Sequence, residues 1–78
     1  MEVRWKTEEF IFDSLREAEV WADSIANEIY GRLFDGYITP DCKIAFALSF
    51  LLASIPEFKV QSHYDGQVYK VWVALVMD

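Results

Sequence analysis

Residues 58–73 have the sequence FKVQSHYDGQVYKVWV and predict a β-hairpin. Apolar and polar side chains alternate on both sides of Asp65-Gly66, a residue pair that is typical of a tight two-residue turn. With that pair as the turn, residue 62 lies opposite residue 69, and residue 58 lies opposite residue 73. One face of the hairpin is then apolar and is expected to contact helices through Phe58, Val60, Tyr69, Val71 and Val73.

Two helices are predicted before the hairpin. Ser14-Leu15-Arg16-Glu17 is a capping box, which predicts a helix over residues 14–34 with Gly36 as a left-handed stop. Thr39-Pro40-Asp41 combines a capping threonine, a proline at the first helical position and an acid in the first turn. It predicts a second helix over residues 40–55, ended by Pro56.

The N-terminal residues predict a further strand, because Val3, Trp5 and Thr7 alternate with Arg4 and Lys6. Phe10-Ile11-Phe12 either continues this strand past a bulge or forms a second short strand. The predicted order is β-α-α-β-β. We therefore expect a single α+β domain over residues 1–78, with a small antiparallel sheet of about three strands and two helices packed on one face.

Composition excludes several classes of protein. Hydrophobic residues make up 54% of the chain, which excludes a disordered segment. Cys42 is the only cysteine, so no intramolecular disulfide can form, and a reducing, cytoplasmic location is expected. No apolar run approaches the roughly 20 residues that a membrane-spanning helix needs. The net charge of −6 argues against nucleic acid as a partner.

Catalytic and metal-binding groups are scarce. His63 is the only histidine and Cys42 the only thiol, and the predicted fold places them on opposite sides of the sheet. A structural zinc site needs about four such ligands, and the three glycines form no phosphate-binding loop. We therefore predict no catalytic residue, no cofactor and no metal, and a protein that is not an enzyme.

The second predicted helix is apolar on all sides. One stripe contains Ile44, Leu48, Leu51, Leu52 and Ile55. The opposite stripe contains Cys42, Phe46, Phe50 and Ala53, and the small residue Ser49 lies beside it. A helix that is apolar all round is expected to be buried all round. Either the first helix, the 10–12 segment or the 36–37 loop covers the second stripe, or this stripe is an interface with another protein. A homodimer is the leading form of that interface.

Two charged surfaces are further candidates for a binding site, with weaker support than the second helix has. Acidic residues of the first helix can meet a basic partner or imitate DNA, with Glu17, Asp23 and Glu28 as the proposed contacts. The outer face of the sheet combines basic residues with aromatic ones, namely Arg4, Lys6, Lys59, His63, Lys70 and Trp72. In that arrangement Lys59 lies opposite Trp72, close enough for a cation–π contact. The face resembles sheets that stack single-stranded bases, although it lacks their aromatic motifs.

The chain is short, acidic and rich in aromatic residues, and in this it resembles small phage or mobile-element proteins that inhibit a host protein by occupying it. The sequence thus predicts a non-enzymatic protein–protein interaction module. Two alternatives stay open: a bacterial structural or regulatory homodimer, and a single-stranded nucleic-acid binder that uses the outer sheet face.

Overall fold

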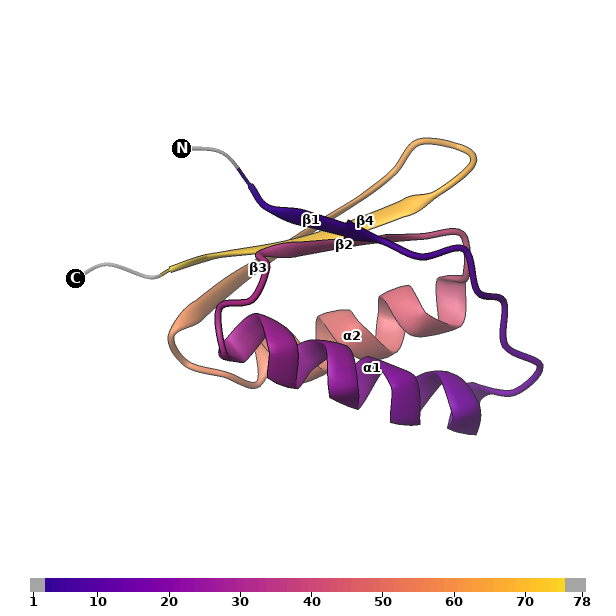
Figure 1. Cartoon of the computed structure of the whole chain (residues 1–78), viewed down its shortest axis with the longest axis horizontal. Coiled ribbons are helices and arrows are strands. Elements are labelled where there is room, and N and C mark those ends of the chain that lie inside the picture. Colours follow the sequence, from indigo (N-terminus) through magenta and orange to yellow (C-terminus); the bar gives the residue numbers. More distant parts are fainter. Residues whose placement is uncertain (1–2, 76–78) are drawn as a thin grey trace.

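The fold was analysed in a computed structural model that describes residues 3–75. The elements follow the order β-α-β-α-β-β: β1 Trp5–Thr7, α1 Leu15–Tyr30, β2 Gly36–Thr39, α2 Cys42–Ala53, β3 Phe58–Tyr64 and β4 Tyr69–Leu75. Both helices lie on one face of the sheet, and the other face carries no helix (Figure 1). The predicted α+β class, with two helices on one face, is confirmed.

The sheet has four strands in the order β1-β2-β4-β3, and it is mixed. β1 runs parallel to β2, whereas β2–β4 and β3–β4 are antiparallel. The sequence predicted about three antiparallel strands. It missed β2 and therefore also the parallel pairing of β1 with β2. α1 forms the connection between β1 and β2, and parallel neighbours need a crossover of this length.

α1 begins as predicted and ends earlier. The Ser14 hydroxyl accepts a hydrogen bond from the Glu17 amide at 3.2 Å, as in a capping box. The helix ends at Tyr30 rather than near residue 34, because Arg32 adopts a left-handed conformation with φ of 67°. Leu33, which lies within the predicted helix but beyond the observed one, is exposed. Gly36 is part of β2 and does not stop the helix.

α2 is capped by Asp41, not by Thr39 as the sequence suggested. Thr39 is the last residue of β2, and its hydroxyl oxygen accepts a hydrogen bond from the Asp41 amide at 3.0 Å. The Asp41 carboxylate accepts from the Lys43 amide at 2.8 Å, which satisfies an amide of the first helical turn. The helix ends at Ala53, two residues before the predicted end.

The β3–β4 hairpin has a register that differs from the prediction. Tyr64 pairs with Tyr69, because the Asp65 carboxylate accepts from the amides of Gln67 and Val68, at 3.0 Å each, and moves the turn to Gly66-Gln67. Gly66 has a φ of 99° at the first central position of this turn. The register shifts by an even number of residues, so no side chain changes face.

The faces of the hairpin are therefore as predicted, although its cross-strand pairs are not. Phe58, Val71 and Val73 are buried against the helices, and Val60 and Tyr69 pack against the same core. Lys59 lies opposite Ala74, and Trp72 lies opposite Gln61. The expected cross-strand cation–π pair of Lys59 and Trp72 is thus wrong.

The segment between β1 and α1 is not a strand, so both alternatives for Phe10-Ile11-Phe12 are wrong. It packs against α1 instead. The ring of Trp21 lies 5.4 Å from that of Phe10 and 5.9 Å from that of Phe12, measured between centroids. Asp41 holds this segment through a 2.7 Å hydrogen bond from the Phe12 amide.

Candidate functional site

The outward side of α2 is the most exposed apolar surface among the predicted site residues. Phe46 is 68% exposed and Phe50 is 77% exposed, whereas Ile44 and Leu48 of the same helix are buried. α1 packs along α2 and leaves the two phenylalanines uncovered. We call Cys42, Phe46, Ser49, Phe50 and Ala53 the α2 stripe.

None of the three segments considered as an internal cover lies over the α2 stripe. The 10–12 segment packs on Trp21 of α1, and Tyr37 is itself buried within β2. Cys42 is partly buried and Ala53 is exposed. The Ser49 hydroxyl donates to the Ala45 carbonyl at 2.7 Å, so its polarity is satisfied within the helix. The two phenylalanines are thus the only large side chains of the stripe.

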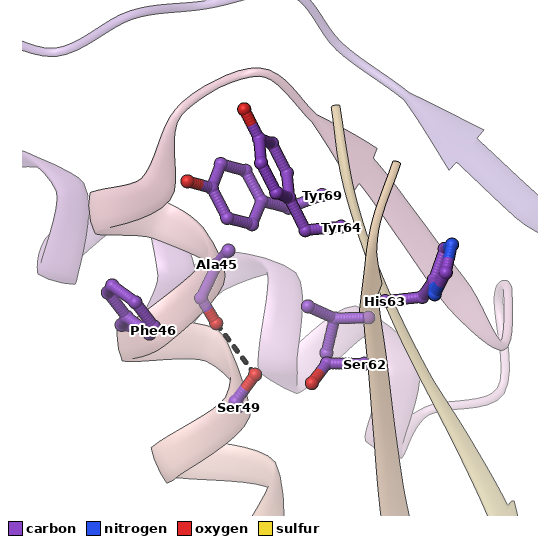
Figure 2. Close-up of a pocket in the computed structure, with 8 residues that line it drawn as sticks. Ala45, Phe46, Ser49, Ser62, His63, Tyr64 and Tyr69 are labelled. Atoms are coloured by element: carbon purple, nitrogen blue, oxygen red, sulfur yellow. Dashed lines mark hydrogen bonds between the residues drawn. The ribbon is translucent and has the colours of Figure 1, made fainter. Parts of the chain in front are cut away.

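A groove of about 180 Å³ separates the α2 stripe from the β3–β4 hairpin (Figure 2). The stacked rings of Tyr64 and Tyr69, with centroids 4.3 Å apart, form one wall. The ring of Phe46 lies 6.4 Å from that of Tyr69 and belongs to the helical wall. Ser62 points toward α2 between the two walls, while the imidazole of His63 points away to the other face. The groove is therefore lined mainly by aromatic and small side chains.

Sequence reasoning missed the hairpin side of this groove. The strict alternation of β3 places Ser62 and Tyr64 on the helix face, so the signal for their orientation was present. Both side chains are nevertheless exposed, because α2 does not cover this end of β3. The exposed surface beside the α2 stripe therefore continues from the helix onto the edge strand.

The outer sheet face holds a smaller set of residues than predicted. Lys59, His63, Lys70 and Trp72 share this face, which follows from their alternation with the buried residues of β3 and β4. Trp5 joins them: its ring packs edge-on against that of Trp72 at 5.6 Å.

Arg4 and Lys6 do not belong to the outer face. The Arg4 guanidinium forms an ion pair with Asp35 at 3.1 Å, and its hydrogen bonds lower the pKa of the Asp35 carboxyl. The Lys6 ammonium lies 5.4 Å from the centre of the Phe34 ring and 3.6 Å from the Glu28 carboxylate, on the helix side. Two of the cations that the sequence predicted for the outer face therefore lie elsewhere.

The acidic surface of α1 is also partly engaged within the monomer. Glu17 accepts a hydrogen bond from the Ser14 hydroxyl at 3.3 Å, and Glu28 pairs with Lys6. Asp23 is exposed. The three acids do not form one cluster around a common point, and Asp23 is the only one of them without an ion pair or capping bond in the described part of the chain.

The buried polar groups have structural partners. The Tyr37 hydroxyl donates to Glu8 at 2.8 Å and accepts from the Trp21 indole at 3.1 Å. Burial raises the pKa of Tyr37 far above its ordinary value. Burial alone would also raise the pKa of Asp41, but the amides of Phe12 and Lys43 outweigh this effect and lower it.

The single histidine and the single thiol of the chain lie on opposite sides of the sheet. His63 projects from the outer sheet face, while Cys42 begins α2 on the helix side. Over residues 3–75, no three His, Cys, Asp or Glu side chains lie where they could hold a metal ion together.

The described helices are also too short or too polar to cross a membrane. Comparison with known proteins found no matching family model, no matching curated protein and no matching solved structure. The functional argument therefore depends on the geometry of the α2 stripe and its groove.

Proposed function

We propose that this chain is a non-enzymatic protein-interaction module, and that the α2 stripe with its adjoining groove is its binding surface. The observation that supports the proposal is the exposure of Phe46 and Phe50 on a helix whose opposite face forms the core. Contiguous exposed apolar surface usually marks a contact site on a soluble domain. Aromatic anchors that enter pockets contribute most of the energy of many protein interfaces.

The groove favours a protein partner over a small molecule. Its volume of about 180 Å³ is smaller than the roughly 300–1,000 Å³ of typical small-molecule sites. Its polar groups are the hydroxyls of Ser49, Ser62 and the two tyrosines, and no charged side chain points into it in Figure 2. A shallow aromatic surface of this kind suits a side chain offered by another protein.

Two biological roles are compatible with such a module. In the first, a small acidic cytoplasmic domain inhibits a host protein by occupying one of its surfaces, as small phage proteins do. In the second, the chain is a structural or regulatory homodimer. Both roles use the α2 stripe, and neither needs a chemical step from Cys42 or His63.

Site-specific photo-crosslinking in producing cells tests the proposal. Benzoylphenylalanine replaces Phe50 in one variant and Val20 in the control, since Val20 of α1 is 67% exposed but lies outside the stripe. We expect a protein adduct, with another copy or with a different protein, from position 50 and not from position 20. A Phe46→Ser change should reduce that adduct. Equal adducts from both positions, or none from position 50, would contradict the proposal.

A further inference from the structure

We propose that the partner is a second copy of this chain, which pairs its β3 edge antiparallel with the β3 edge of the first copy. The sheet then continues across the dimer, and Phe50 of each copy enters the groove of the other. This inference depends on the proposed function, because it assigns a partner to the α2 stripe and its groove.

β3 is an open edge of the sheet, and its free backbone groups can be identified. The Asp65 amide donates to the Val68 carbonyl at 3.2 Å, so residues 65 and 68 form a hydrogen-bonded pair. Such pairs alternate along an antiparallel ladder, so residues 63, 61 and 59 bond to β4 in the same way. The N–H and C=O groups of Val60, Ser62 and Tyr64 therefore point away from β4, toward solvent.

The β3 edge has few of the features that usually block pairing. Residues 58–64 contain no proline, and their one formally charged residue, Lys59, points to the outer face rather than toward the helices. Native proteins commonly protect an edge strand by such features or by making it short. The opposite edge follows this rule, because β1 has only three residues. β3 has seven residues and offers the longer unpaired ladder.

Charge complementarity favours a second copy and selects the register. With a two-fold axis at Ser62, Val60 lies opposite Tyr64 of the second copy, and every outward N–H and C=O group of these residues is paired. On the outer face, the same register places Lys59 opposite Asp65 of the second copy. A shift by two residues would place Lys59 opposite His63 in one direction or opposite Gln67 in the other, and either shift would lose this pair of opposite charges.

The position of α2 brings Phe50 toward the second copy. Phe46 lies beside the Tyr64–Tyr69 end of the hairpin, and Ser49 lies across from Ser62 (Figure 2). α2 therefore runs antiparallel to β3, so the position of Phe50, one helical turn beyond Phe46, is level with Val60 along the helix axis. Because Val60 pairs with Tyr64 across the axis, Phe50 meets the groove of the second copy. Its volume of about 180 Å³ suits a phenyl ring, since a dry cavity of about 150 Å³ binds benzene.

The two phenylalanines supply about a third of the area that a small dimer needs. A specific interface buries roughly 800 Å² per partner, about 15% of the 5255 Å² surface of this chain. Phe46 and Phe50 together expose about 300 Å² at roughly 200 Å² for each full aromatic side chain. Tyr64, Ser62, Val60 and the edge backbone lie next to them and supply further area.

A proline at the axis tests the pairing. We expect the native chain to sediment as a dimer and Ser62→Pro to raise its dissociation constant by about tenfold or more, because each copy loses an outward N–H and gains a ring at the axis. An edge strand tolerates proline where the N–H faces solvent, so the far-UV circular dichroism should persist. Ser62→Ala keeps the N–H, so its dissociation constant should rise far less than that of Ser62→Pro.

A disulfide trap gives a second test that does not need the proline variant to fold. In a Cys42→Ala background, Ser62→Cys should form a covalent dimer under mild oxidation, since paired residues at the axis have Cα atoms about 5.5 Å apart, within disulfide range. Ser54→Cys, on the exposed end of α2, should not.

The outcomes separate this inference from the proposed function. A native chain that sediments as a monomer at its highest soluble concentration overturns the second copy as partner. So does a dimer that resists Ser62→Pro and whose Ser62→Cys variant forms no disulfide between copies. In either case, a position-50 photo-adduct that depends on Phe46 still supports an interface on the α2 stripe. If that adduct is also missing, the proposed function fails as well.

Discussion

The carboxylate of Asp41 accepts a hydrogen bond from the backbone amide of Phe12 at 2.7 Å, across 29 positions of the chain. The same carboxylate caps α2 through the Lys43 amide and lies 3.3 Å from the Lys43 ammonium. One buried side chain thus joins the segment before α1 to the start of α2.

Asp41→Ala should be among the most destabilising polar substitutions. It removes a helix cap, worth about 0.5–2 kcal/mol, and leaves the partly buried Phe12 amide without its charged acceptor, which adds about 1–3 kcal/mol. Urea unfolding followed by circular dichroism would measure the loss. Asp13→Ala, at an exposed neighbouring position, is the control and should change the free energy of unfolding by less than about 0.5 kcal/mol. Equal effects would exclude the proposed role of Asp41.

The stability of the fold should decrease in acid. The pKa values of Asp35 and Asp41 lie below their ordinary value in the folded chain, so the unfolded chain binds more protons as the pH falls. Their contribution is complete above the unfolded pKa of about 3.9 and is lost as the pH falls through the folded values. Thermal melting between neutral pH and pH 2 should show this loss, and an Asp41→Asn variant should show a shallower dependence. An unchanged slope in that variant would contradict the assignment.

Phe46→Ser combined with Phe50→Ser should leave the fold of a single chain intact. Both rings are mostly exposed, so their removal should cost the monomer about 1 kcal/mol or less while weakening association. Leu48→Ala, on the buried side of the same helix, should cost about 2–5 kcal/mol. Sedimentation combined with thermal melting distinguishes the two effects. Unfolding of the double serine variant would mean that the rings belong to the core.

Lys59→Glu should weaken the proposed dimer, because the new glutamate of each copy would then lie opposite Asp65 of the other copy. Exposed ion pairs contribute about 0.2–1 kcal/mol, and a two-fold dimer contains two of them, so the dissociation constant should rise roughly twofold to thirtyfold. The effect should be larger at low ionic strength, where screening is weaker. Lys70→Glu changes the same charge on β4, away from the edge, and should have little effect. Equal weakening by both variants would exclude the proposed register.

Gly36→Ala should destabilise the sheet. An added Cβ would lie 2.6 Å from the Trp5 ring and 2.9 Å from the Trp72 Cβ, so at least one tryptophan must move. Crowding of this kind costs about 1–3 kcal/mol, and the emission of the tryptophans should change with it. The substitution should cost less in a Trp5→Ala background, where the closer contact is absent. An equal cost in both backgrounds would show that the Trp5 contact is unimportant.

Local sequence was sufficient for the existence of both helices, for the start of α1 and for the faces of the hairpin. The Ser14 cap and the apolar stripe from Ala18 to Ile29 depend on residues within a few positions of one another. The alternation in β3 and β4 has a period of two, so it assigns faces correctly even though Asp65 moves the turn and shifts the register.

β2 was not predictable in the same way. Gly36–Thr39 is only four residues long, and its glycine and threonine also fit the end of one helix and the start of the next. It is a strand because β1 and β4, both distant in sequence, bond to its two sides. Because Thr39 belongs to this strand, Asp41 is the cap of α2, and its carboxylate also binds the Phe12 amide.

The candidate site, too, could be predicted from the sequence only in part. That α2 is apolar on every side follows from its sequence, and with it the expectation that Phe46 and Phe50 need a partner surface. That α1 leaves these rings uncovered, and that they lie beside the open β3 edge with Tyr64 and Tyr69, follows only from the packing of segments far apart in the chain. The period of a helix or strand shows which residues share a face, but only long-range contacts determine what covers that face.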